Sequence, residues 1–173
     1  QSFLKLREQY GEQLRWVVLN FPMHEMHREA RPAAIAALAA GRQGRYWDFH
    51  DRLLGPEVVF DRATYVKWAG ELGMDVEQFT KDLADPKLEE QIEAERLLSY
   101  KLGITATPSM FINGLFNEGF ASSTSLGRLI DQEIAAAKEA GGNDYYVNLM
   151  GQALKEADFP NAGQLQSSTS SQP

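Results

Sequence analysis

The chain has 173 residues, of which 43% are hydrophobic and 24% charged, a composition typical of one globular domain. Its 17 Lys and Arg against 24 Asp and Glu give a formal charge of -7, which argues against nucleic acids and anionic membranes as principal partners. The sequence has no cysteine, which excludes a CxxC pair, a cysteine nucleophile and a cysteine-ligated zinc site within it, and no apolar run approaches the roughly 18 residues that span a bilayer.

The first predicted element is a helix over residues 2–10. Phe3, Leu6 and Tyr10 recur at spacings of three and four, which places them on one helical face. Gly11 is a plausible stop.

A strand is predicted over residues 15–21, ended by Pro22. The run 16–19 is apolar at consecutive positions, a pattern typical of a strand covered on both faces. We therefore expect both faces of this run to be buried, with Val18 and Phe111 in one core.

Helix signals dominate residues 30–102, where five helices are predicted. Three acidic N-caps stand out, because each precedes a periodic apolar pattern. The signals are an alanine-rich run after Pro32, the apolar positions Tyr46, Phe49 and Leu53, the cap Asp61 before Tyr65 and Trp68, the capping-box pair Asp75 and Gln78, and Asp85 before Pro86.

A hairpin and a final helix are predicted next. Residues 109–112 form a strand, Asn113-Gly114 a type I′ turn, and residues 115–120 the returning strand. The helix that follows is expected to be capped by Ser123 or Thr124 and ended by Gly141-Gly142.

Several short sequence motifs, taken in their order along the chain, resemble the DsbA-like branch of the thioredoxin superfamily. These motifs are residues 20–23, 43–51 and 72–75, and Thr107-Pro108 followed by Asn113-Gly114. The resemblance implies an α/β fold, with a thioredoxin-like sheet and a helical insertion. On this basis residues 1–140 form the domain, with the insertion at about 25–102. Independently of the resemblance, apolar residues at helical spacing predict a helix over 145–157 within a C-terminal extension over 141–160. The Gly-, Ser-, Gln- and Pro-rich composition predicts a disordered polar tail over 161–173.

The resemblance also implies that the CxxC motif and a first central strand lie upstream of Gln1 and are missing from this chain. That strand would sit between the strands predicted at 15–21 and 109–112. Because each buried unpaired backbone group costs about 1–3 kcal/mol, we expect other backbone to fill the slot. The candidates are a further N-terminal segment, a bound cleaved peptide, a second copy of the chain, or its own C-terminal part.

The function implied by the resemblance is thiol-disulfide oxidoreduction on protein substrates. Ala106, Thr107 and Pro108, with a cis peptide bond before the proline, would bind an extended peptide. This chain by itself would carry no catalytic residue, metal or cofactor, and its location would be periplasmic or otherwise extracytoplasmic. Two alternatives stay open: a redox-inactive peptide-binding or scaffold module, and a glutathione-dependent enzyme with a serine near the position of Ser2.

Other side chains permit a functional and a structural interpretation. His24, His27 and His50 could suggest a metal site, but no acidic partner accompanies them, so packed or solvated histidines are favoured. Trp47, Phe49, Tyr65 and Trp68 could line a groove, but aromatic residues at helical spacing are more often core.

Overall fold

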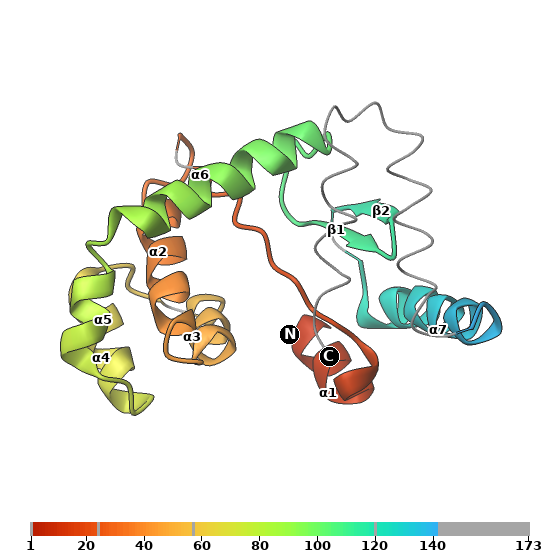
Figure 1. The fold of residues 1–173 in the computed structure, drawn as a ribbon, viewed down its shortest axis with the longest axis horizontal. Helices are drawn as coiled ribbons and strands as arrows, with labels where there is room; N and C mark the ends of the chain where they lie inside the picture. Colours follow the sequence, from red (N-terminus) through yellow and green to blue (C-terminus); the bar gives the residue numbers. More distant parts are fainter. Residues whose placement is uncertain (1, 24, 57, 120, 142–173) are drawn as a thin grey trace, which may run out of the picture. The chain divides into compact units, whose positions relative to one another are not determined.

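The computed structural model describes residues 2–23, 25–56, 58–119 and 121–141 (Figure 1). The chain forms two compact units, one made of residues 1–16 and 106–173 and the other of residues 17–105. The helix predicted at 145–157 and the tail predicted at 161–173 lie outside the described residues.

In its described part, the first unit combines two helices with a hairpin (Figure 1). Helix α1 spans Ser2–Tyr10 as predicted, and a single 3-10 turn, η1, follows at Gly11–Gln13. The hairpin consists of β1, Ser109–Ile112, and β2, Leu115–Glu118. Helix α7 spans Ser123–Glu139. Their shared core consists of Leu6, Tyr10, Leu126 and Ile130.

The cap of α7 differs from the prediction by one residue. Ser122 is the N-cap, and its hydroxyl accepts a hydrogen bond from the backbone N–H of Ser125 at 3.0 Å. Ser123 and Thr124 are instead the first two residues of the helix. Since four hydroxyl residues stand in a row over 122–125, the sequence pattern alone does not select the one with extended backbone geometry.

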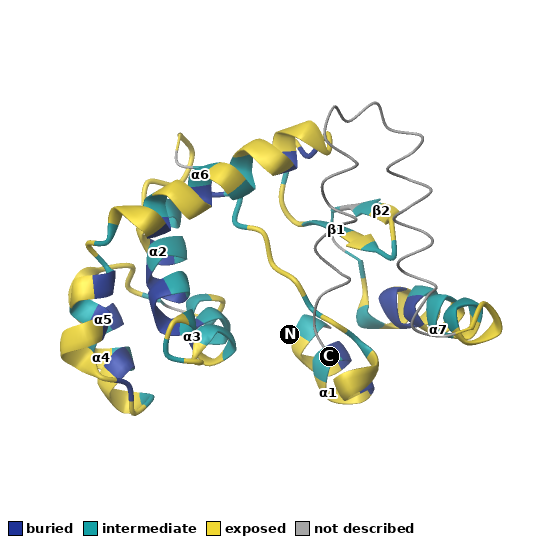
Figure 2. Ribbon diagram, in the orientation of Figure 1, coloured by how far each residue is buried: buried dark blue, intermediate teal, exposed yellow. Residues whose placement is uncertain are grey.

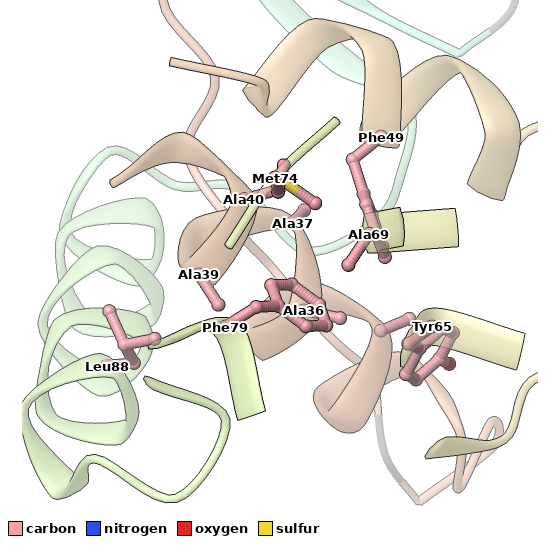
Figure 3. Packing of buried hydrophobic residues seen from close by; sticks show 11 residues of the cluster. Ala36, Ala37, Ala39, Ala40, Phe49, Tyr65, Ala69, Met74, Phe79 and Leu88 are labelled. Atoms are coloured by element: carbon pink, nitrogen blue, oxygen red, sulfur yellow. The ribbon is translucent and has the colours of Figure 1, made fainter. Parts of the chain in front are cut away.

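The second unit is helical (Figure 1). Its elements are α2 at Ala30–Gly41, α3 at Tyr46–Leu53, α4 at Arg62–Glu71, α5 at Val76–Asp82 and α6 at Pro86–Lys101. Alanines of α2 pack close to Phe79 and Met74, and Phe49, Tyr65 and Leu88 complete the core (Figure 3). Small side chains on α2 allow neighbouring helices to approach closely, so the alanine-rich run serves packing.

The acidic helix caps of this unit are confirmed. Asp61 accepts from the backbone N–H of Thr64, Asp75 from that of Gln78, and Asp85 from that of Lys87. The reciprocal half of the predicted capping box is wrong. The N–H of Asp75 donates to the side chain of Gln43 at 2.8 Å, while the Gln78 amide donates to Asp82 at 3.0 Å.

The predicted strand over residues 15–21 is not formed, and the expected common core of Val18 and Phe111 is wrong. No helix or strand is present over residues 14–23, and Val17, Val18 and Leu19 are exposed (Figure 2). Phe111 is also 44% exposed. A strand exists only with a hydrogen-bonded neighbour, and in the described part of the chain β1 and β2 pair solely with each other.

Candidate functional site

The candidate site is the loop between α6 and β1. Helix α6 ends at Lys101, and Gly103, with a φ of +77°, turns the chain out of it. Positive φ suits glycine because it has no Cβ. The N–H of Ile104 then donates to the carbonyl of Ser99 at 2.9 Å, so the start of the loop is anchored to the last turn of α6.

Two hydrogen bonds hold the second half of the loop. The hydroxyl of Ser109 donates to the carbonyl of Ala106 at 2.7 Å. The N–H of Gly119 donates to the carbonyl of Pro108 at 2.8 Å, which extends the hairpin register by one residue. The Thr107–Pro108 peptide bond is cis, the isomer that the resemblance implies. The loop is therefore fixed on both sides of Thr107.

Thr107 itself presents free backbone. Its side chain and that of Pro108 are exposed, while Ala106 is half-buried. Within the described residues, neither the N–H nor the C=O of Thr107 has a hydrogen-bond partner. A fixed, exposed peptide unit with both polar groups unpaired can exchange hydrogen bonds with another extended chain.

The other candidate residues do not join this loop into a larger site. Ser2 is the first residue of α1, and His24 lies outside the described residues. His27 is exposed, whereas His50 stacks on Tyr46 and its Nδ1 lies 3.3 Å from a carboxylate oxygen of Asp51. Among the described residues, no three His, Asp or Glu side chains are grouped as a metal would need.

A cavity in the helical unit was not anticipated from the sequence. It has a volume of about 210 Å³ and lies among residues 18–22, the alanine face of α2, and Tyr46, His50 and Leu53 of α3. Burial raises the pKa of the Tyr46 hydroxyl to about 12, so it stays protonated at neutral pH. Apolar walls with few polar groups suit an uncharged side chain rather than an ion. The signal for this cavity was the run of small residues on α2.

Two hydrogen bonds from Asn20 to Glu95 hold one wall of that cavity. Its main-chain N–H and its side-chain amide both donate to one carboxylate oxygen of Glu95 on α6, each at 2.7 Å. The rings of Phe21 and Tyr100 then pack edge to face at 5.1 Å. These contacts order the segment after Leu19 even though it joins no sheet.

Comparison with known proteins places this fold in a family. Residues 5–132 match the model of the DSBA-like thioredoxin domain. The chain belongs to the DSBA-like thioredoxin domain family. In structure it is similar to a thioredoxin-like oxidoreductase from Silicibacter pomeroyi, with a TM-score of 0.65, 28% identity and 76% of each chain covered. The resemblance drawn from the sequence and the thioredoxin-like fold class are thus confirmed.

Curated relatives of this DSBA-like domain carry the name Na(+)/H(+) antiporter NhaA. The protein from Herminiimonas arsenicoxydans is 35% identical over 113 residues, which cover 65% of this chain and 18% of that protein. One from Salinispora tropica is 30% identical over 129 residues, covering 72% and 19%. The chain therefore spans about a fifth of the length of these relatives. Among its described residues, no helix is both long and apolar enough to cross a membrane.

Proposed function

We propose that this DSBA-like domain is the peptide-docking part of a thiol-disulfide oxidoreductase, and that it binds extended segments of protein substrates at Ala106, Thr107 and Pro108. The observation that carries this proposal is the exposed Thr107 peptide unit, whose two polar groups are unpaired among the described residues while the residues around it are fixed. Binding an extended chain would satisfy both groups at once.

Preorganisation favours this use of the loop. The hydrogen bonds of Ala106 and Pro108 to Ser109 and Gly119 hold the backbone before any peptide arrives, so little entropy is lost when a peptide pairs with Thr107. Main-chain pairing does not depend on the partner's sequence, which suits an oxidoreductase that acts on many unfolded substrates.

The redox chemistry itself requires a thiolate, which attacks a disulfide sulfur. The chain has no cysteine, so in this proposal these residues position a substrate and a thiol outside them reacts with it. A redox-inactive binding module would use the same loop without any thiol. A glutathione-dependent enzyme, with an active serine near the position of Ser2, is the lesser alternative.

The names of the relatives suggest the kind of polypeptide to which this domain belongs. We infer that the domain is a module of a longer polypeptide that also contains a sodium–proton antiporter, because the domain matches less than a quarter of several proteins with that name. The docking loop would then act at an extracytoplasmic membrane surface, where protein disulfides persist.

Docking is tested by titrating the chain with insulin B chain whose cysteines have been carboxymethylated, an extended probe that cannot react. Thr107→Pro removes the N–H of residue 107, whereas Thr107→Val keeps it with nearly the same shape. We expect Thr107→Pro to weaken binding at least fivefold, because it loses about one hydrogen bond to the peptide. Thr107→Val, which keeps that bond, should change the affinity less than twofold.

Equal losses of affinity in the two variants would show that the threonine side chain makes the interaction, which would overturn backbone docking. Wild-type affinity in Thr107→Pro would overturn it too, because that variant has no N–H at residue 107. Thermal melting of both variants shows whether Thr107→Pro has kept its fold. In a parallel assay we expect no reduction of intact insulin by the chain and dithiothreitol above that by dithiothreitol alone. Reduction above this level would require chemistry that this proposal assigns to a thiol elsewhere.

A further inference from the structure

The tip of the β1–β2 hairpin is a turn made of Asn113 and Gly114, the only Asn-Gly pair in the sequence. Both residues have positive φ values, as a two-residue hairpin turn requires. The side-chain amide of an asparagine and the backbone nitrogen of a glycine are therefore neighbours in this turn. Because glycine has no Cβ, no side chain of residue 114 hinders the approach of one group to the other.

The backbone nitrogen of Gly114 takes part in no hydrogen bond of the hairpin. The register pairs Ile112 with Leu115, so the ladder of β1 and β2 ends just before the turn. Gly114 is exposed, and among the described residues its N–H has no acceptor. A nitrogen in this state is open to hydroxide and can act as a nucleophile once it has lost its proton, whereas an N–H within the ladder is occupied by its acceptor.

The side chain of Asn113 fastens the tip of the hairpin to α7. Its Nδ2 donates to Oε2 of Glu133 at 3.1 Å, and both residues are half-buried. Met110 and Ile112 of β1 already pack against the core that α7 shares with α1. The bond to Glu133 therefore adds a polar contact at the turn to an apolar contact along the strand, and it occupies the amide that lies next to Gly114.

We propose that Asn113 is a site of spontaneous deamidation, and that its bond to Glu133 controls the rate. The deprotonated nitrogen of Gly114 attacks Cγ of Asn113, so that one C–N bond forms. The C–N bond to Nδ2 then breaks, and this nitrogen leaves as ammonia with the proton that Gly114 gave up. Water opens the resulting succinimide at either carbonyl, which gives aspartate or isoaspartate at position 113. The Asn113 side chain must first leave Glu133, because both contacts cannot be made at once.

The product reverses the sign of the contact with α7. A carboxylate at position 113 accepts hydrogen bonds but donates none, so it faces the Glu133 carboxylate with like charge where an amide now donates. Isoaspartate also lengthens the backbone of a turn that has only two residues, which disturbs the register of Ile112 and Leu115. Deamidation therefore releases the hairpin tip from α7. This consequence does not depend on the proposed function at Thr107.

The reaction is measured by incubating the folded full chain at slightly acidic and at alkaline pH, followed by peptide mass spectrometry with chromatographic separation of isoaspartate. We expect residue 113 to gain about 1 Da, faster at alkaline pH. Asn20 and Asn117 are internal controls, because Phe21 and Glu118 follow them. They should react about tenfold more slowly, since a side chain hinders the attacking nitrogen. Equal rates at the three asparagines would overturn the proposal.

Paired variants at position 133 test how the rate is controlled. Glu133→Ala removes the acceptor of the Asn113 amide, whereas Glu133→Gln keeps a carbonyl oxygen in a side chain of the same length. We expect Glu133→Ala to deamidate at least about threefold faster than wild type and Glu133→Gln less than about twofold faster. Circular dichroism confirms that both variants remain folded. An unchanged rate in Glu133→Ala would overturn the control by Glu133.

The consequence for the fold is tested with Asn113→Asp, which has the charge of the product. We expect it to lower the urea midpoint of the wild-type chain at neutral pH. In the Glu133→Gln chain the amide of residue 133 can donate to the new carboxylate, so the loss should disappear. An equal loss in both backgrounds would overturn the release of the tip. The insulin B chain titration of Thr107→Pro reports on the docking loop separately, so either proposal can fail while the other stands.

Discussion

The hydroxyl of Tyr10 lies 2.8 Å from Oδ1 of Asp131 and 3.0 Å from the carbonyl of Gly127, so one side chain of α1 connects to two successive turns of α7. The hydroxyl has a single hydrogen, which these two acceptors share. Burial raises the pKa of Tyr10, and the hydrogen bond to the Asp131 carboxylate raises it further. This contact joins residues 121 positions apart in the sequence.

Tyr10→Phe should lower the thermal midpoint by a few degrees, because it removes the only hydroxyl bonded to both acceptors in the described residues and leaves the Gly127 carbonyl without that partner. Tyr100→Phe is the matched control. Its side chain is 50% exposed, and its hydroxyl only accepts from Arg96 at 3.3 Å. Calorimetry that gives equal shifts for the two variants would show that the Tyr10 bridge adds nothing to stability.

The effect of Gly127→Ala on stability should depend on whether residue 10 is Tyr or Phe. Alanine is favoured over glycine inside a helix by up to about 1 kcal/mol, but a Cβ at residue 127 would lie 3.3 Å from the Tyr10 hydroxyl. We expect Gly127→Ala to be neutral or destabilising in the wild-type chain and stabilising in the Tyr10→Phe chain. A double-mutant cycle in urea measures this coupling, and an equal effect in both backgrounds would rule out the contact.

Arg42 neutralises a buried carboxylate in the helical unit. Its guanidinium lies 2.7 Å from Asp82, which is 5% exposed, and 2.7 Å from Asp85. Arg42→Met should reduce the free energy of unfolding by about 1–3 kcal/mol, since among the described residues Asp82 would keep only its bond from Gln78. Lys81→Met breaks an exposed pair with Glu77 instead and should cost less than about 0.5 kcal/mol. Urea unfolding of both variants gives the comparison.

The ion pair between Arg42 and Asp85 also affects stability in acid. The N–H of Lys87 and then the Arg42 guanidinium lower the pKa of Asp85 below its ordinary value of 3.8. A lowered folded-state pKa stabilises the fold above the unfolded value, and this stabilisation is lost as pH falls through the folded value. The difference in stability between wild type and Arg42→Met should therefore narrow as pH falls below about 4.

Tyr65→Phe should be harmless at neutral pH and protective at alkaline pH. The Tyr65 hydroxyl is buried without a partner among the described residues, and burial raises its pKa to about 12 from 10.0. The unfolded chain ionises first, so the stabilisation from the neutral hydroxyl is complete below pH 10 and is lost between pH 10 and 12. Urea unfolding at pH 8 and pH 11 should show a smaller alkaline loss in the variant. An unchanged loss would place the titration elsewhere.

Local signals predicted most of the helical unit. Asp61 and Asp85 cap helices because their side chains need only the next few N–H groups, which the sequence itself supplies. Asn113 and Gly114 adopt the positive φ values of +46° and +90° that a two-residue hairpin turn requires. The position of the candidate loop could be predicted for the same reason, from Thr107-Pro108 and the turn after it.

Features that depend on distant partners could not be predicted. The run 16–19 has every local property of a strand, but pairing depends on backbone that a sequence pattern cannot place. The cavity near Tyr46 depends on how closely α2 and α3 approach, which small side chains permit without specifying.

The three tryptophans give the two cores separate optical reporters. Trp16 packs against the core of α1 and α7, whereas Trp68 packs against the helical core and Trp47 lies edge to face with Tyr46 at 5.3 Å. Replacing Trp16 leaves emission from the helical unit alone, and replacing Trp47 and Trp68 together leaves emission from the other core. Fluorescence of such variants would follow the unfolding of each core without any attached dye. An unfolding midpoint measured on the wild-type chain could then be assigned to the core that unfolds there.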